Sequence, residues 1–270
     1  MPAANAAPCP DAQVVFARGT TEQPGAGPTG DAFIESLRSR VGAKSIGVYG
    51  VDYPAAMDFA TAIDGIVDAR AHILDTVASC PDTKLVLSGF SQGAAVIGFV
   101  TASEVPDGIS PLDVPAPMPP EVADHVTAVA LFGKPSTRFM KVINDPSIVV
   151  GPLYVAKTVD LCVDNDLVCD PDGSSFSIHD KYAETGMVDE GAIFVANRLQ
   201  ASWAADAAAA ATSTTAPTPQ SPSMPTPAPL SAPAAVAPPV HLGSTSPTLP
   251  GPPPVPGPAP VAPPPAAPLA

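Results

Sequence analysis

Short apolar runs that alternate with longer helical patterns constrain this chain more than any other feature. Five runs are almost continuously apolar and rich in β-branched residues, and they cover residues 13–17, 45–51, 84–88, 126–132 and 153–159. Such runs are typical of strands that are buried on both faces of a parallel sheet. The segments between and after them predict helices over 29–41, 58–79, 92–103 and 189–208. The sequence therefore predicts an α/β fold, a three-layer α/β/α sandwich around a central, mostly parallel five-stranded sheet, with right-handed crossovers.

A change of composition near residue 207 predicts where the folded domain ends. Residues 207–270 hold 21 of the 38 prolines and no Lys, Arg, Asp or Glu. A segment with so few large apolar side chains cannot offset the entropy that ordering it would cost. We therefore expect a folded domain over 1–206 and a disordered Pro/Ala/Ser/Thr-rich tail over 207–270. The tail would serve as a linker, or as a tether to a cell wall or a partner.

The charge and hydropathy of the chain argue against several classes of binding partner. The formal net charge of -14 argues against nucleic acid or an anionic membrane surface as a primary partner, although solubility alone would also explain it. No run of about 18 apolar residues occurs, so the sequence predicts no transmembrane segment. The start, MPAANAAPCPD, has neither the basic nor the apolar region of a signal peptide. We expect that such a peptide was removed or that this start is internal.

The four cysteines of the chain, Cys9, Cys80, Cys162 and Cys169, predict two disulfides and an oxidising compartment. Four cysteines allow three pairings. Cys162 and Cys169 are close in sequence and are a natural pair, which leaves Cys9 with Cys80. No C-x-x-C and no nearby histidine pair occurs, which argues against zinc, and we expect no metal.

The motif G-F-S-Q-G at residues 89–93 directly follows the third apolar run and precedes a helical segment. A serine between a strand and a helix sits on a sharp turn that exposes its hydroxyl above the sheet, beside the amides of the helix N-terminus. The alternative is a structural Gly-Ser turn. The context favours Ser91 as a nucleophile.

A serine hydroxyl needs a base, and on this type of scaffold the order is nucleophile, acid, then histidine. His72 precedes the serine, His241 lies in the tail, and His125 leaves little room for an acid before it. Elimination therefore favours His179 as the base. The alternative for this histidine is a surface or helix-capping role.

Five aspartates compete for the role of the acid, at positions 160, 164, 166, 170 and 172. Asp164 and Asp166 lie between Cys162 and Cys169, where a crosslink would fix the loop. Because a mobile acid would orient the histidine poorly, this loop is favoured, and within it we prefer Asp166 to Asp164.

The oxyanion formed during acyl transfer would be stabilised by the amide of Gln92, which follows the nucleophile. A second donor usually comes from the loop after an early strand. Here that loop contains Thr20, which offers an amide and a hydroxyl. The alternative is that Arg18 and Glu22 merely form a polar turn with an ion pair.

Four motifs together make the chain resemble the cutinase family. They are A-R-G-T-T-E at 17–22, G-F-S-Q-G at 89–93, C-V-D-N-D-L-V-C at 162–169 and S-I-H-D-K-Y at 177–182, supported by Y-P-A at 53–55 and F-G-K-P at 132–135. The resemblance covers roughly residues 8–205. The Ala/Pro-rich composition and acidic balance of the chain are similar to those of mycobacterial cutinase-like serine esterases.

The resemblance implies Ser91 as nucleophile, Asp166 as acid and His179 as base, and so decides between the two aspartates. It also implies Thr20 and Gln92 as oxyanion donors, and the disulfides Cys9–Cys80 and Cys162–Cys169. The family frequently has serine and tyrosine where this chain has Thr20 and Phe90, and neither change removes a backbone amide. The tail lies outside the resemblance.

The resemblance implies a secreted or cell-wall-associated carboxylic ester hydrolase that needs no metal or cofactor. We expect a monomer that hydrolyses lipid or cutin-like esters with short to medium acyl chains. Three alternatives remain: an acetylxylan-type carbohydrate deacetylase, a phospholipase or thioesterase, and a cell-wall protein displayed by its tail with weak catalysis. The proline-rich loop over 104–122 is long enough to have a function of its own, and contact with substrate is left open.

Overall fold

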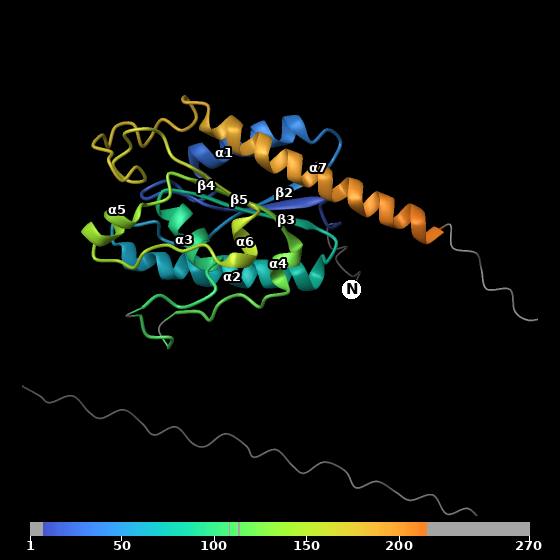
Figure 1. The fold of residues 1–270 in the computed structure, drawn as a ribbon, viewed down its shortest axis with the longest axis horizontal. Helices are drawn as coiled ribbons and strands as arrows, with labels where there is room; N and C mark the ends of the chain where they lie inside the picture. The colour runs from blue at the N-terminus through green and yellow to red at the C-terminus, as the bar shows by residue number, and fades with distance from the viewer. Residues whose placement is uncertain (1–7, 108, 113, 215–270) are drawn as a thin grey trace, which may run out of the picture. The chain divides into compact units, whose positions relative to one another are not determined.

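The computed structural model describes residues 8–107, 109–112 and 114–214. Five strands form one sheet in the order β2-β1-β3-β4-β5, and every neighbouring pair is parallel (Figure 1). The strands are β1 (Ala12–Ala17), β2 (Ile46–Gly50), β3 (Lys84–Phe90), β4 (Val126–Phe132) and β5 (Thr158–Leu161). The predicted parallel five-stranded sheet is confirmed. Since β2 lies on one side of β1 and β3 on the other, the strand order reverses between β1 and β3, where ligands bind in open α/β sheets.

Helices cover both faces of the sheet (Figure 1). Helices α1 (Gly27–Arg40) and α7 (Met187–Thr214) pack together on one face, and α2 (Ala62–Ser79) and α3 (Gln92–Val100) on the other. The shorter helices are η1 (Phe59–Thr61), α4 (Val122–His125), α5 (Thr137–Val142) and α6 (Pro152–Val155). The three-layer sandwich is therefore confirmed, and the predicted bounds of α1, α2 and α3 hold to within about one turn.

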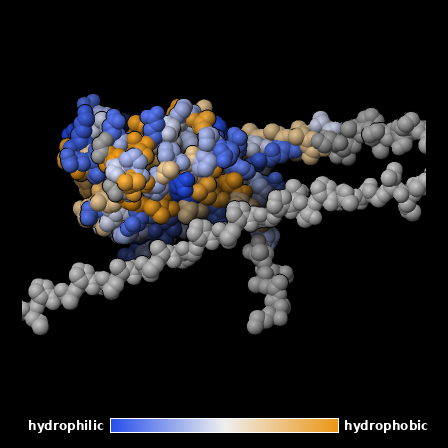
Figure 2. Space-filling view, turned by 90° about the horizontal axis from the view of Figure 1, so that it is seen from below, coloured by the Kyte–Doolittle hydropathy of each residue, from blue (hydrophilic) through white to orange (hydrophobic). Residues whose placement is uncertain are grey.

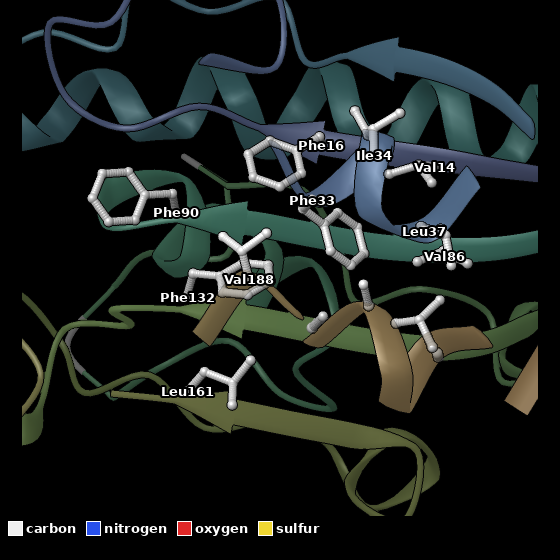
Figure 3. Packing of buried hydrophobic residues seen from close by; sticks show 14 of the residues in the cluster. Val14, Phe16, Phe33, Ile34, Leu37, Val86, Phe90, Phe132, Leu161 and Val188 are labelled. Carbon is white, nitrogen blue, oxygen red and sulfur yellow. The ribbon is translucent and has the colours of Figure 1, made fainter. Parts of the chain in front are cut away.

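Two hydrophobic cores lie on opposite sides of the sheet, because successive side chains of a strand point to opposite faces. In β1, Phe16 belongs to the core beneath α1 and α7, and Val15 and Ala17 belong to the core beside α2 and α3. Phe33 of α1 packs between Phe16 and Phe132, with ring centroids 6.3 and 5.3 Å apart (Figure 3). Both faces of β1, β3 and β4 are buried, which explains their continuous apolar runs, whereas β2 and β5 at the edges of the sheet are only partly buried.

The fifth apolar run was placed wrongly. We predicted a strand over 153–159, but residues up to Val155 form α6 and the strand is Thr158–Leu161. Pro152 suits the first turn of a helix, where its missing N–H is not needed. Leu153 and Val155 are 53% and 58% exposed, so these apolar residues belong to no core. Periodicity cannot separate helix from strand over so short a run.

Helix α7 continues beyond the predicted end of the folded domain. Residues 207–214 are helical, although we placed them in the tail. They are mostly alanine, which has the highest helix propensity, so the helix propagates without burying a further face. No helix of the described residues, α7 included, is long and apolar enough to cross a membrane. The expected disorder of the remaining tail concerns residues 215–270, which lie outside the described part of the chain.

Two disulfides form, Cys9–Cys80 and Cys162–Cys169, as predicted. The first joins segments that precede β1 and β3, at the amino edge of the sheet. The second closes the loop that directly follows β5, at the carboxyl edge. The two crosslinks therefore act at opposite ends of the sheet, and only the second can influence residues at the carboxyl edge directly.

Candidate active site

The carboxyl edge of the sheet gathers the candidate residues, because parallel strands all end there. The loop with Thr20 follows β1, Ser91 follows β3, and the loop with Asp166 and His179 follows β5. Chain segments that are more than 150 residues apart therefore meet at one edge.

The backbone at Ser91 has φ 55° and ψ −119°, a conformation that non-glycine residues rarely adopt. Its amide donates to the Phe132 carbonyl at 2.9 Å. A Cβ on Gly93 would lie 1.9 Å from the Ala17 carbonyl oxygen, and one on Gly89 would lie 2.4 Å from the Gly93 backbone. Both glycines are therefore required by close backbone approach, as the motif predicts, and the half-exposed serine is held on a strained turn.

Ser91, His179 and Asp166 form a continuous chain of hydrogen bonds. The Ser91 hydroxyl lies 2.8 Å from His179 Nε2, and His179 Nδ1 lies 2.7 Å from Asp166 Oδ2. Because a carboxylate only accepts, Nδ1 carries the proton and Nε2 is free to accept from the serine. Asp166 is fully buried whereas Asp164 is exposed, so the structure brings Asp166 and not Asp164 to the histidine.

Two further contacts hold the imidazole of His179. Its ring stacks on Phe90, with centroids 5.0 Å apart and an interplanar angle of 27°. A Cβ on Gly133 would lie 2.9 Å from His179 Cε1, so the glycine after β4 leaves room for the ring. The histidine is 3% exposed, and its orientation is therefore set by packing as well as by hydrogen bonds.

The buried carboxylate of Asp166 has two further donors. The Val168 amide donates to Oδ1 at 2.9 Å, and the Tyr182 hydroxyl donates to Oδ2 at 2.8 Å. Burial raises the pKa of Asp166, but the hydrogen bonds from His179, Val168 and Tyr182 outweigh it and hold the pKa below its ordinary value. The acid is thus kept ionised inside the protein.

Tyr182 is a site residue that the sequence reasoning missed. Its side chain is fully buried, and its hydroxyl also accepts from the Val163 amide at 3.3 Å. Burial and the neighbouring Asp166 carboxylate raise the pKa of Tyr182, so the phenol stays protonated and can donate. Its position three residues after His179 is the only signal in the sequence that could have indicated it.

Replacing Tyr182 with phenylalanine should lower kcat about tenfold and the free energy of unfolding by about 2 kcal/mol at pH 7, because the ionised acid loses a buried donor. The folded pKa of Asp166 lies below its unfolded value of about 3.9, so its contribution to stability is present above about pH 4 and is lost as pH falls through the folded pKa. The stability difference between wild type and variant should therefore shrink in acid. Chemical denaturation at several pH values measures this. The matched variant Tyr154→Phe, in the other core, should change neither quantity much, and a pH-independent difference would contradict this role.

The loop after β1 is fixed by a buried arginine. Arg18 is 4% exposed and donates to the backbone carbonyls of Glu22 at 2.9 Å, of Val51 at 3.2 Å and of Tyr53. The Tyr53 hydroxyl in turn donates to the Arg18 carbonyl at 2.5 Å. Within the described residues Arg18 and Glu22 form no ion pair, so the ion-pair part of the polar-turn alternative is wrong. The turn itself is present, because the Glu22 amide donates to the Gly19 carbonyl at 3.2 Å.

The amides of Thr20 and Gln92 are available at this edge. The Gly19 amide donates a hydrogen bond to Glu22 Oε2 at 2.6 Å. By contrast, the amides of Thr20 and Gln92 donate to no acceptor among the described residues. Burial raises the pKa of Glu22, which that hydrogen bond only partly offsets. The Gln92 side chain donates from Nε2 to the Ala56 carbonyl at 3.0 Å and ties the elbow to the loop after β2.

The bridge between Cys162 and Cys169 lies against the acid: the disulfide-bonded Cys169 Sγ is 3.2 Å from Asp166 Oδ2. Replacing both of these cysteines with serine should remove about 2.5 kcal/mol of stability by the chain-entropy estimate and lower kcat more than tenfold, because Asp166 loses its fixed position. The matched Cys9→Ser/Cys80→Ser variant removes a bridge that closes a longer loop, so it should lose about 4.4 kcal/mol yet keep kcat. Thermal unfolding and ester kinetics measure both. If kcat were unchanged without Cys162–Cys169, the bridge would have no role in positioning.

Comparison with known proteins agrees with this architecture. The sequence profile of the cutinase family matches residues 8–199. The chain is 60% identical over 167 residues to the probable carboxylesterase Culp5 of Mycobacterium tuberculosis, a match that covers 62% of this chain and 95% of the relative. It is 47% identical over 191 residues to the phospholipase Culp4 of the same organism, covering 71% and 80%.

Among solved structures, a Trichoderma reesei cutinase in complex with a phosphonate inhibitor superposes with a TM-score of 0.54 at 31% identity, covering 71% of this chain and 78% of that one. The family profile spans the described residues from 8 to 199, so only the C-terminal end of α7 lies outside it, and both the fold and the relatives agree with it. The chain therefore belongs to the cutinase family of carboxylic ester hydrolases.

Proposed function

We propose that the protein is a secreted serine esterase that cleaves carboxylic esters through Ser91, His179 and Asp166. The observation that carries this proposal is the contact of 2.8 Å between Ser91 Oγ and His179 Nε2, with Asp166 on the other ring nitrogen. His179 takes the hydroxyl proton while Ser91 Oγ forms a bond to the carbonyl carbon. Asp166 holds the imidazole in the required tautomer and stabilises the imidazolium.

The negative charge that develops on the carbonyl oxygen would be accepted by the free amides of Thr20 and Gln92. The tetrahedral intermediate collapses when His179 protonates the leaving alcohol, which leaves an acyl group on Ser91. His179 then takes a proton from water while the water oxygen forms a bond to the acyl carbon. The second intermediate collapses when His179 returns that proton to Ser91 Oγ, which breaks the bond between Oγ and the acyl carbon and releases the acid. Each step uses side chains and amides of this chain.

Hydrophobic side chains around the site favour apolar esters. Met57 is 80% exposed in the loop that Gln92 holds, and Phe176 is 58% exposed with its ring centroid 5.8 Å from that of His179. Lipid or cutin-like esters with short to medium acyl chains suit such a surface. Phospholipid is the second candidate, because a relative named as a phospholipase is 47% identical to this chain. An acetylxylan deacetylase has less support, since the acetyl group that it removes has only one methyl group to place against the exposed Met57 and Phe176.

Two disulfides and an ester-hydrolase family agree with a secreted or cell-wall-associated enzyme. We propose that it acts as a monomer, without metal or cofactor, and that residues 207–270 beyond the predicted domain are dispensable for catalysis and serve as a wall tether or linker. The ordered hydrogen bonds of Ser91 and His179 argue against a displayed protein with weak catalysis.

Titration with an active-site organophosphate tests the nucleophile. Activity on p-nitrophenyl butyrate should be lost with one equivalent bound, and mass spectrometry should place the adduct on Ser91. Ser91→Ala should take up none. Wild-type protein that turned over no p-nitrophenyl ester would overturn the esterase assignment, and label on another residue would overturn the role of Ser91. Comparing phosphatidylcholine and acetylxylan with the p-nitrophenyl ester ranks the substrate classes.

A further inference from the structure

The acid and the base of the proposed site share one long connection between β5 and α7. Asp166 and His179 both lie in this connection, over residues 162–186, where the chain forms turns and an isolated bridge but no helix or strand. The disulfide fixes only the first part of the connection, because it ends at Cys169. Residues 170–178, which join that part to His179, are therefore held in place by other contacts.

Part of this joining segment folds back against the acid. The Gly173 amide donates to the Asp170 carbonyl at 3.0 Å, and a Cβ on Gly173 would lie 2.2 Å from the carbonyl oxygen of Asp166. Asp166 also pairs with Ser175 in an isolated bridge. Because these backbones touch, a shift of residues 171–175 would move the backbone that carries the acid.

Arg138 of α5 holds the same segment from outside. Its Nη1 donates to the Pro171 carbonyl at 2.8 Å and to the Gly173 carbonyl at 3.0 Å. Both acceptors belong to the main chain, so the contact fixes the backbone itself. A guanidinium donates in a fixed plane and carries a full charge, which makes such bonds strong and directional. Figure 1 shows α5 at the same end of the sheet as this connection.

Ser136, at the start of α5, holds the acid loop at a second place. Its amide and its hydroxyl donate to the Val168 carbonyl at 2.9 and 3.1 Å. Val168 is the residue whose amide donates to Asp166 Oδ1. The short segment from Ser136 to Arg138 therefore contacts the loop both at Val168 and at the turn that packs on the acid.

Helix α5 is a firm support, because its fully buried Met140 anchors it to the domain. Met140 lines an apolar cavity of about 270 Å³ that α2 and α3 also line. Figure 2 faces this side of the molecule and shows hydrophobic side chains gathered on it. Arg138 is exposed, so its guanidinium can be removed without opening a cavity in the core.

The connection that carries Arg138 also contacts the other two members of the proposed triad. The Phe132 carbonyl accepts from the Ser91 amide at 2.9 Å, and Gly133 leaves room for the ring of His179. One segment, residues 132–138, therefore contacts the backbone of the nucleophile, the ring of the base and the loop of the acid. A change at its outer end should affect the geometry between acid and base.

We propose that Arg138 is a positioning residue for Asp166, and through it for the hydrogen bond between Asp166 and His179. The inference rests on the proposed esterase function and deepens it, because it adds a residue that touches neither substrate nor the reacting atoms. Arg138 acts by holding residues 171–173 against the acid. Its loss should lower kcat and leave KM nearly unchanged, since the imidazolium is stabilised in the transition state and not in the bound ester.

Removing the donors of Arg138 tests the proposal. Arg138→Met should lower kcat on p-nitrophenyl butyrate about tenfold with KM changed less than about twofold, and Arg138→Lys, which keeps a charged donor, should recover most of the kcat. The matched control is Arg38→Met on α1, since Arg38 is also exposed and also donates to a backbone carbonyl, that of Ile46 at 3.1 Å. Wild-type kcat in Arg138→Met would overturn the proposal, as would an equal loss in Arg38→Met.

A double variant separates positioning of the acid from a general effect on the fold. If Arg138 acts through Asp166, adding Arg138→Met to Asp166→Asn should lower kcat no further, because the carboxylate that it positions is already gone. A further decrease of about tenfold in the double variant would show that Arg138 acts by another route, and the proposal would be wrong.

Proton NMR tests the geometry without turnover. The proton on His179 Nδ1, which lies 2.7 Å from Asp166 Oδ2, should give a sharp resonance downfield of the backbone amides in wild type. This resonance should broaden in Arg138→Met and sharpen again in Arg138→Lys. If wild type hydrolysed no ester, the proposed function would fail, and the resonance would still decide the role of Arg138. If wild type hydrolysed esters while Arg138→Met kept both the resonance and kcat, the positioning role alone would fail.

Discussion

Replacing Ser91 with glycine should abolish ester hydrolysis and stabilise the protein at the same time. The serine has φ 55° and ψ −119°, a region that only glycine adopts freely, and such strain costs about 1–3 kcal/mol. Glycine loses more chain entropy on folding, about 0.5–1 kcal/mol, so a net gain of about 1 kcal/mol remains. Without the hydroxyl, kcat should fall at least about 10⁴-fold, leaving only what the proposed oxyanion donors, the amides of Thr20 and Gln92, would supply.

The matched variant is Ser91→Ala, which removes the same hydroxyl but keeps a Cβ at the strained position. It should lose activity equally and gain no stability. Chemical denaturation and the turnover of p-nitrophenyl butyrate measure the two properties for both variants. Equal stability of Ser91→Gly and Ser91→Ala would show that the backbone strain is not relieved by glycine. Residual kcat near the wild-type value in either variant would show that Ser91 is not the nucleophile.

Replacing Asp166 with asparagine should lower kcat about 10⁴-fold while leaving KM for short esters nearly unchanged. The Tyr182 hydroxyl and the Val168 amide both donate to this carboxylate, so an amide cannot satisfy all of its partners. An amide N–H facing His179 would place the ring proton on Nε2. That nitrogen could then no longer accept from Ser91.

Asp164→Asn is the control, because Asp164 lies in the same disulfide-closed loop but is exposed. It should retain wild-type kcat. Measuring kcat and KM for both variants on p-nitrophenyl butyrate separates loss of the base from loss of binding. A large decrease in Asp164→Asn with an active Asp166→Asn would reverse the assignment of the acid.

The sequence predicted the layers and the sheet because both depend on local patterns. Continuous apolar runs at β1, β3 and β4 require burial on both faces, and that requirement is visible in each run separately. The prediction of a strand over the fifth run was wrong, because a mostly exposed apolar helix, α6, and a half-buried strand, β5, have similar short patterns. The predicted end of α7 was wrong for a related reason. Composition indicates where a hydrophobic core ends, but an alanine-rich helix can continue beyond that core.

The sequence by itself determined which residues stand at the candidate site. A serine between two glycines and one histidine in a suitable place are readable from order and spacing. Two aspartates lie between the two cysteines, and the resemblance to the cutinase family was needed to decide for Asp166 over Asp164. Only the tertiary structure decided what surrounds them. Tyr182 beside Asp166 and the arginine that fixes the loop after β1 both depend on contacts between separate segments of the chain. Such contacts are set by packing in three dimensions, which leaves no periodic trace in a single sequence.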